Sequence, residues 1–570
     1  MFLKKVKTDK NRIFLQIVEG YRNEKGKPSH RVVESLGYLD ELDEKHDGKA
    51  LEYYTEYAKQ LTKQTRLPKE ITINANRILE EGKSSLRNVG YLALKPIYKN
   101  LKLNNVCNAL NAKYKTKANI SDVLEFLIYS KIIDASSKIS SYMKKDKYFE
   151  NFSFSEDQMY RCLSYIGNSY EQIIDYVFRT SNEAYGLDLS KSYYDGTNFY
   201  FEIDYETKFQ RKGPSKERRT DPLVSIGLLL DANYLPIDMC IYPGNENEKP
   251  HFTDVINEMK AKNKINNRTI YIADKGLSCG NNIFNALKNG DGYIYSVSVR
   301  GASKKVKEFI INEEGFKYKL DDYGDVIYAI KDFIVDDAEV TFEFNGKKIT
   351  RKCKQKQVVT WTKSYADKTR YERNKLIKKA EKLIKSPKDF DRSKVGDASN
   401  YIKKISYDKN GEIIEEQSVL SLDIEKIKEE EKLDGFYMIV TSELNMKAED
   451  IVEAYRNLYH IENTFRVQKL YLKTRPVYLS REERIKAHLL ISYISLLMLR
   501  ILEQKVLKNK FCIEEIIDSL REYECALIHP NVYFFFKYNK VVEALGKISS
   551  SNVRLETQSL SGIKKLFKQY

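Results

Sequence analysis

The chain of 570 residues is poor in several residue types that define other classes of protein: it has 7 cysteines, 6 histidines, 11 prolines and 1 tryptophan. The cysteines are dispersed and include no Cys-x-x-Cys pair, which excludes a disulfide framework and fits a reducing compartment. The histidines do not cluster with the cysteines, which argues against a structural zinc site. No internal repeat or low-complexity linker interrupts the sequence.

Long hydrophobic runs are also scarce. The most apolar run, residues 489–499, is bounded by His488 and Arg500. It is much shorter than the roughly 20 residues that a bilayer core requires. The N-terminus carries no apolar stretch of signal-peptide length. The sequence therefore predicts a cytoplasmic protein with no membrane partner.

Basic and aromatic residues, in contrast, are abundant. The chain has 97 Lys and Arg against 81 Asp and Glu, a net charge of +16 and a pI of about 9.0. Such an excess favours a polyanionic partner, nucleic acid before an acidic membrane. With 42% hydrophobic residues, 42 Tyr and 25 Phe, the chain can build packed cores, and its length allows roughly three or four domains.

Two segments precede the region that carries the motifs. Residues 1–50 alternate as strands do, around a turn-prone stretch at 23–28, and predict a β-rich segment. Residues 51–186 are mainly helical in pattern, most clearly from Ile120 to Ile133. We interpret this helical region as a domain that recognises DNA ends. A helical module without a DNA-binding role is the alternative.

Residues 187–300 change to an α/β pattern. The expected order is β-β-β-α-β-α-β, with strands at 192–203, 223–230, 235–242, 269–273 and 293–299 and helices at 249–262 and 281–288. Three hairpin-linked strands followed by βαβ units imply a mixed sheet with helices on its faces. That is the order of a ribonuclease-H-like core.

The rest of the chain interrupts and then completes this core. Residues 301–433 predict a mainly β insertion, with hairpin signals at Asn345-Gly346 and Asn410-Gly411. Residues 434–510 resume the core, and residues 511–570 predict a helical C-terminal tail. Four further elements are expected: a basic helix at 366–385, a strand at 435–440, a long helix from about Met446 to Leu472 and an apolar helix at 486–503.

Three carboxylates stand out by their context. Asp195 lies in the middle of an aromatic strand, where a buried charge is costly unless a partner such as a metal ion compensates it. Asp274 directly follows an apolar strand, the place where α/β proteins build their sites, although a turn or N-cap aspartate is the alternative. Glu462 lies within the long helix.

The long helix adds a geometric argument. Tyr455, Glu462 and Lys469 are spaced by seven residues, and seven residues are close to two helical turns, so the three share one face. Arg466 lies on the same stripe, four residues after Glu462. The alternative is an exposed Glu–Arg pair on a solvated face.

These segments resemble the DDE transposases of bacterial insertion sequences, and within them the insertion-sequence-four superfamily. That group carries a Tyr-x2-Arg-x3-Glu-x6-Lys signature, which here reads Tyr455, Leu458, Glu462 and Lys469. The resemblance spans about residue 192 to the C-terminus. Other similar strings are Tyr193-Tyr-Asp-Gly-Thr197, Pro243-Gly-Asn245, Ala273-Asp-Lys-Gly276, Asp434-Gly-Phe-Tyr437, Ile461-Glu-Asn-Thr-Phe-Arg466 and Arg475-Pro-Val-Tyr478.

The resemblance implies a function and a set of residues. Asp195, Asp274 and Glu462 are expected to hold Mg²⁺, or Mn²⁺ in its place, for two-metal phosphodiester chemistry. The enzyme would cleave the terminal inverted repeats of its element and join them to target DNA. A homodimer is expected at synapsis, with the C-terminal tail as one candidate interface. Leu458 replaces the signature Arg that is associated with the DNA end, and Arg466 or Arg456 are its candidate substitutes.

Further residues are expected to contact DNA. Tyr455, Lys469 and Arg466 belong to the signature helix. Trp361, in the insertion, would stack on a base flipped out near the cleavage point, as an aromatic does in related transposases, or would simply pack in the core. Phosphate contacts are expected from a loop, Arg211, Lys212, Lys216, Arg218 and Arg219, and from a helix, Arg370, Arg373, Lys375, Lys378, Lys379, Lys382 and Lys385.

Two other classes stay open at this point. One is a ribonuclease-H-like nuclease that cleaves DNA without strand transfer. The other is a non-catalytic DNA-binding protein derived from the same fold, although such a protein does not need three converging acids.

Overall fold

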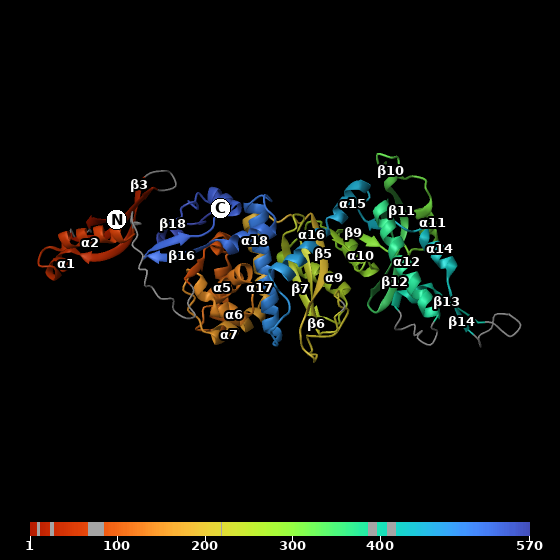
Figure 1. The fold of residues 1–570 in the computed structure, drawn as a ribbon, viewed down its shortest axis with the longest axis horizontal. Helices are drawn as coiled ribbons and strands as arrows, with labels where there is room; N and C mark the ends of the chain where they lie inside the picture. The colour runs from red at the N-terminus through yellow and green to blue at the C-terminus, as the bar shows by residue number, and fades with distance from the viewer. Residues whose placement is uncertain are drawn as a thin grey trace. The chain divides into compact units, whose positions relative to one another are not determined.

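The computed structural model describes residues 1–7, 12–22, 28–65, 85–217, 219–385, 396–406, 418–529 and 531–570. The chain divides into two compact units, residues 1–165 with 497–570, and residues 166–496. The divisions fall inside two helices, α7 (Glu156–Gly167) and α17 (Glu482–Ile501). Figure 1 shows the elements of both units.

The N-terminal part of the first unit is a small sheet with two helices. Strands β1 (Phe2–Lys7), β2 (Ile13–Arg22) and β3 (Pro28–Tyr38) pair antiparallel, as the alternation predicts. Helices α1 (Leu39–Lys45) and α2 (Ala50–Thr65) follow. Leu15, Leu42 and Ala50 form the core of this part, so α2 belongs to it and the boundary expected at residue 50 is misplaced.

The helical region of the first unit contains α3 (Lys95–Asn100), α4 (Leu103–Tyr114), α5 (Ile120–Ile133), α6 (Lys138–Met143) and α7. The prediction of a helix from Ile120 to Ile133 is confirmed, and α5 is almost wholly buried. The Asn119 side chain caps its start by accepting a hydrogen bond from the Ser121 backbone N–H.

The C-terminal segment is not a purely helical tail. It contains α18 (Ile513–Glu522), β16 (Glu524–His529), β17 (Val532–Phe535), α19 (Lys540–Ile548), β18 (Thr557–Gln558) and α20 (Leu560–Ile563). Its strands form a four-stranded sheet in the order β18-β17-β16-β4, where β4 is Leu86–Asn88. The pairing with β4 joins residues far apart in sequence, and short strands of this kind leave only a weak alternating pattern.

The second unit is built on a nine-stranded mixed sheet in the order β10-β11-β12-β15-β9-β8-β5-β6-β7 (Figure 1). Its strands are β5 (Lys191–Tyr200), β6 (Leu223–Leu230), β7 (Pro236–Pro243), β8 (Ile270–Ala273), β9 (Gly292–Val297), β10 (Lys317–Leu320), β11 (Val326–Phe344), β12 (Lys347–Thr362) and β15 (Phe436–Thr441). β5 pairs antiparallel with β6 and parallel with β8, and β8 pairs parallel with β9. Helices α9 (Glu248–Asn263) and α10 (Gly280–Lys288) complete the predicted β-β-β-α-β-α-β order, which is confirmed.

Strands β10, β11 and β12, from the predicted insertion at residues 301–433, extend this sheet. Its hairpin β11–β12 turns at Asn345-Gly346, as predicted, and β12 pairs antiparallel with β15 of the core. The insertion also contains α11 (Lys304–Ile311), α12 (Lys363–Lys385), α14 (Ile424–Glu431) and a separate pair of strands, β13 (Ile402–Ser406) and β14 (Ser418–Leu422). The predicted turn at Asn410-Gly411 lies outside the described residues.

The long helix expected from Met446 to Leu472 is interrupted. It forms α15 (Ala448–Arg456) and α16 (Tyr459–Arg466), followed by a π-helical turn over Val467–Tyr471. At the junction the Leu458 backbone N–H bonds the Tyr455 carbonyl, a tight three-residue turn. The sequence has neither Gly nor Pro at the junction, so it gives no signal for this break.

Among the described residues, one helix is long and apolar enough to cross a membrane by length and composition. It runs from Glu482 to Val506, longer than the predicted run, and 94% of its most apolar stretch is buried inside the protein. Packing in the protein interior therefore accounts for its apolar surface.

Candidate active site

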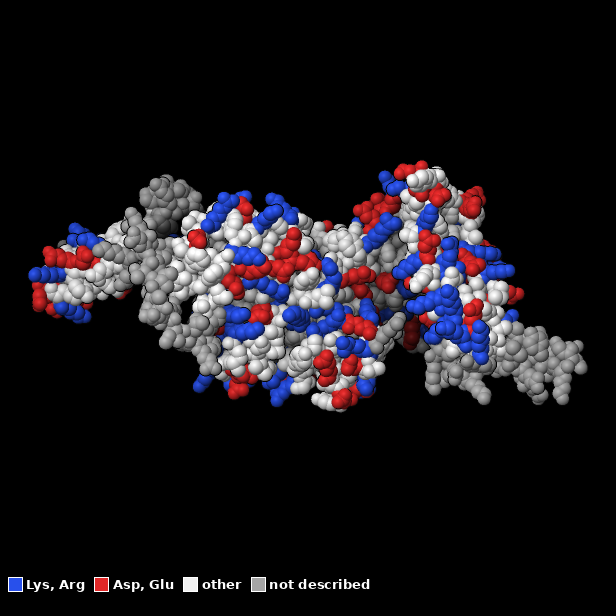
Figure 2. Space-filling view, viewed as in Figure 1, with Lys and Arg blue, Asp and Glu red and all other residues white. Residues whose placement is uncertain are grey.

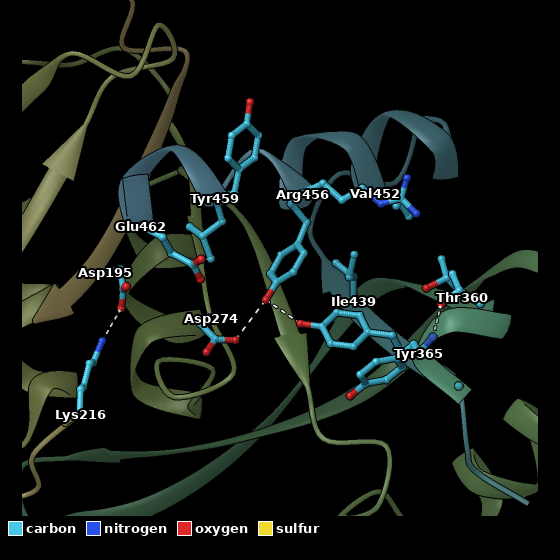
Figure 3. A pocket seen from close by; sticks show the side chains of 15 residues that line it. Asp195, Lys216, Asp274, Thr360, Tyr365, Ile439, Val452, Arg456, Tyr459 and Glu462 are labelled. Atoms are coloured by element: carbon cyan, nitrogen blue, oxygen red, sulfur yellow. Dashed lines mark hydrogen bonds and ion pairs between the residues drawn. The ribbon is translucent and has the colours of Figure 1, made fainter. Parts of the chain in front are cut away.

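Three acidic residues line one pocket of about 480 Å³ in the second unit. Asp195 comes from the middle of β5, Asp274 directly follows β8, and Glu462 lies on α16. Figure 3 shows Glu462 extending from its helix toward the space between the other two carboxylates. The structure thus brings together the three acids that the sequence selects.

Strand register explains why two of the acids meet. Tyr194 pairs with Ala273 across the parallel strands β5 and β8. Asp195 and Asp274 are the next residue on each strand, so they lie side by side where β8 ends. This is the carboxyl end of β8, the edge at which α/β sheets place their sites.

The Asp195 carboxylate is half-buried and faces a cation from the basic loop. Lys216 Nζ lies 3.2 Å from Asp195 Oδ1 and also donates to the Gly196 carbonyl. The Gly196 backbone N–H donates to the same carboxylate at 2.8 Å. Burial raises the pKa of Asp195, and Lys216 opposes that shift. The Lys216 ammonium therefore offsets part of the cost of burying the Asp195 carboxylate.

Hydroxyl groups hold Asp274. Tyr455 Oη donates to Asp274 Oδ1 at 3.1 Å, and Ser296 Oγ donates to it at 3.2 Å. Tyr437 donates in turn to the Tyr455 hydroxyl at 2.6 Å. Burial raises the pKa of Tyr455, which keeps its hydroxyl protonated and able to donate. The signature tyrosine thus orients the second carboxylate.

The resemblance to DDE transposases implies DNA cleavage at this pocket, and we expect Tyr455→Phe to lower its rate about tenfold, because a hydrogen bond to a charged group contributes about 1.5–3 kcal/mol. Tyr365→Phe is the matched control, since Tyr365 lines the same pocket. The rates should be measured under single-turnover conditions with a melting curve for each variant. Equal rates for Tyr455→Phe and the wild type would show that the hydroxyl does not orient Asp274.

Lys469 is less available to DNA than the signature suggests. Its side chain is 14% exposed and lies 3.5 Å from Glu217 of the basic loop. Burial, reinforced by Lys216, lowers the pKa of Lys469 to about 8. Arg475 also pairs with Glu217. This glutamate ties the basic loop to the segment that follows α16.

The pocket suits a hard divalent cation in the chemistry of its donors. Its acids offer oxygen ligands, and no histidine or cysteine is among the described residues that line it. The Lys216 ammonium at Asp195 marks a place for positive charge. As the side chains lie, no three His, Cys, Asp or Glu residues in the described part of the chain form a group arranged to hold an ion. Binding would therefore need side-chain adjustment.

The other predicted DNA contacts are not gathered at the pocket. Trp361 is half-buried and donates from its indole N–H to the Asp434 carbonyl at 3.0 Å, which fits the packing alternative better than base stacking. Arg211 lies 3.9 Å from Glu206, and Lys212 and Arg466 are exposed. None of these four is among the described residues that line the pocket. Arg218 lies outside the described residues.

The basic helix α12 divides into two kinds of residue. Figure 2 shows Lys and Arg gathered over it on one face. Of the residues predicted to contact phosphate, the exposed ones are Arg370, Lys375, Lys378, Lys379, Lys382 and Lys385. Arg373, in contrast, is 2% exposed and pairs with the buried Asp434. The expectation that Arg373 contacts phosphate is therefore wrong, because its charge is already used inside the protein.

The sequence does not predict the roles of Lys216, Ser296 and Tyr437, which contact the acids of the pocket or their partners. Lys216 was assigned only to phosphate contact, because its pairing with Asp195 crosses a loop that no pattern predicts. Ser296 and Tyr437 belong to strands β9 and β15. A lone hydroxyl such as Ser296 in an otherwise apolar and aromatic strand was the signal available.

A comparison with models of protein families agrees with this site. A model of the transposase DDE domain matches residues 190–498, which is more than half of the chain and includes all three acids. The chain therefore belongs to the DDE transposases. A model of the N-terminal domain of IS1634 family transposases matches residues 3–70, so the chain is a DDE transposase of an insertion sequence. No curated protein gives a match.

The family fixes the class of activity. A transposase binds DNA, and the enzymes of the DDE class use divalent metal ions. The N-terminal match covers the three-stranded sheet and α2 together, in line with their shared core.

Proposed function

We propose that this transposase cleaves the terminal inverted repeats of its insertion sequence and joins them to target DNA at one Mg²⁺-dependent site. The observation that supports this most is the meeting of Asp195, Asp274 and Glu462 in one pocket from three separate elements. Divalent ions that assist phosphodiester cleavage need oxygen ligands, and three neighbouring carboxylates would supply them.

We also propose that the core is ribonuclease-H-like. In the order β7-β6-β5-β8-β9, the first three strands are antiparallel neighbours and the last two run parallel to β5. Asp195 lies on the central strand β5 and Asp274 after its neighbour β8. The insertion would then be an extension at one edge of this core, reached through β15.

The roles of the residues follow from their contacts. Asp195, Asp274 and Glu462 would hold Mg²⁺, for which Mn²⁺ would substitute. The chemistry that bound metal would supply is activation of the attacking oxygen and stabilisation of the leaving oxygen. Tyr455 keeps Asp274 in place. Lys216 has a half-exposed side chain and can leave Asp195 to bind a phosphate of the DNA backbone.

Arg456 is the residue we propose in place of the signature arginine that Leu458 replaces. It lines the pocket and is exposed, with its guanidinium 5.5 Å from the centre of the Tyr328 ring. Leu458 lines the same pocket but is buried. A cation at this position would contact a phosphate near the cleaved bond.

We expect Arg456→Ala to weaken binding of the terminal repeat and to reduce the salt dependence of binding by about one unit of slope, because one phosphate contact is lost. Arg466→Ala is the comparison, since Arg466 is exposed but lies outside the described pocket lining. Gel shifts over a salt series give both slopes. A reduced slope for Arg466→Ala with an unchanged slope for Arg456→Ala would assign the role to Arg466 instead.

The DNA outside the pocket would lie against several basic surfaces. The exposed lysines and arginines of α12 are suited to backbone contacts that position DNA without reading its sequence. The helical region of the first unit, α3 to α7, is proposed to recognise the element ends. Two ends must be processed together, so we propose a homodimer at synapsis, in the cytoplasm and associated with the nucleoid.

The proposal is tested with the purified protein, DNA that carries the inverted repeats flanking its gene, and a labelled target plasmid. With Mg²⁺ we expect 3′-hydroxyl ends at the repeat boundary and joined products, both abolished by EDTA. Cleavage without joining would indicate a nuclease. Repeat binding with neither reaction would indicate a non-catalytic derivative.

A further inference from the structure

A fourth acidic residue, Glu248, lies against the strand that carries Asp195. Glu248 is the first residue of α9, and its Oε1 atom is buried with no hydrogen-bond partner among the described residues. It occupies the space left by the missing side chain of Gly196: a methyl group added there would overlap Glu248 Oε1. Because residue 196 is a glycine, the Glu248 carboxylate can pack directly against strand β5.

The end of β8 lies beside the place where Glu248 meets β5. Side chains alternate along a strand, so Glu248 approaches β5 from the face opposite to Asp195. β8 ends at Ala273, which pairs with Tyr194, and beyond that pair no described strand continues on this side of β5. Gly196 pairs with Gly227 of β6 on its other side, so it lacks a neighbouring strand only on the side of β8.

The electrostatics of Glu248 tie it to the same acids. Burial, together with the charge of Asp195 and a smaller effect of Asp274, raises the pKa of Glu248 to about 7. Lys216 opposes these effects and is already shared with Asp195. Asp195 and Glu248 thus both interact with the Lys216 ammonium, and a divalent cation would add positive charge beside these two buried carboxylates.

A role at the helix terminus does not explain this arrangement. An acid in the first turn of α9 is favourable, but Asn247 is the capping residue and accepts from the Lys249 backbone N–H. A carboxylate that served the helix alone would not need a buried oxygen without a partner.

We propose that Glu248 is a fourth acidic residue of the divalent-ion site, which strengthens ion binding from the α9 side of Gly196. This inference rests on the proposed function, because it assumes that Asp195, Asp274 and Glu462 hold the ions. Glu248 lies on α9, and no residue of α9 is among the described residues that line the pocket.

The test measures Mn²⁺ affinity of the full-length protein by isothermal titration, with melting curves taken without metal. Glu248→Gln keeps the shape of the side chain and removes its charge, and we expect about 10–100-fold weaker Mn²⁺ binding with no loss of melting temperature. Gly196→Ala displaces the carboxylate without changing the charge, and should also weaken binding. Unchanged Mn²⁺ affinity in either folded variant would overturn the proposal.

Two control variants separate this role from general damage. Glu246→Gln removes a nearby exposed acid that pairs with His251, and Gly276→Ala adds a methyl group in open space two residues after Asp274. Both should bind Mn²⁺ as the wild type does, and losses as large as that of Glu248→Gln would overturn the assignment.

Asp195→Asn in the same titration separates the inference from the proposed function. Weak binding by Asp195→Asn with normal binding by Glu248→Gln rejects only the role of Glu248. Normal binding by Asp195→Asn rejects the metal site itself.

Discussion

Asp195→Asn is expected to reduce cleavage of the terminal repeat at least about 10³-fold while the protein still binds that DNA. Asp195 lies in the middle of β5 and is one of the three proposed Mg²⁺ ligands. The asparagine amide is a poorer ligand for Mg²⁺ than the carboxylate. Affinity for DNA should persist because lysine and arginine contacts with phosphates dominate it. Cleavage and gel-shift binding should be measured side by side.

The fold of Asp195→Asn should be intact. Burial raises the pKa of Asp195, so the folded protein disfavours its charged form, and that penalty is present above the folded-state pKa and absent at low pH. The neutral amide avoids the penalty, and we expect a melting temperature at neutral pH no lower than that of the wild type. Asp204→Asn, an exposed position, is the matched control. Cleavage near the wild-type rate would remove Asp195 from the site.

Arg373→Met should destabilise the second unit by about 3 kcal/mol, because it leaves the buried Asp434 without its main partner. The two side chains are 2% and 6% exposed. The loss is placed at the lower end of the range for broken buried pairs because Arg300 lies 3.9 Å from the same carboxylate. Urea unfolding followed by the fluorescence of Trp361, which bonds the Asp434 carbonyl, measures the effect.

The control for Arg373→Met comes from the same helix. Arg370→Met removes an exposed ion pair with Asp367, which should change stability by less than about 0.5 kcal/mol. Arg373→Met combined with Asp434→Asn should recover part of the loss, since neither buried charge then remains. A stability change for Arg373→Met as small as that of Arg370→Met would contradict the structural role of the pair.

The local patterns of the core were enough to predict its order of elements. Asp195 in an aromatic strand and Asp274 after an apolar one are local signals, and both residues line the pocket. Asn345-Gly346 likewise predicted a turn from two residues alone. These features depend on short stretches of chain, which a sequence displays directly.

Features that depend on distant contacts were not predictable in the same way. The break after Arg456 has no helix-breaking residue, and the pairing of β16 with β4 joins residues far apart in the sequence. Arg373 is an intermediate case. Arg373 lies seven residues from both Ala366 and Ala380, the other buried residues of α12. This spacing predicts the buried face of the helix, whereas the charge of Arg373 predicts the exposed face.

The most direct test of the metal site is anomalous diffraction from crystals of the protein bound to terminal-repeat DNA and Mn²⁺. We predict Mn²⁺ peaks within coordination distance of Asp195, Asp274 and Glu462, with Lys216 moved away from Asp195. Mn²⁺ bound elsewhere, with Lys216 still paired to Asp195 beside the DNA, would contradict the account.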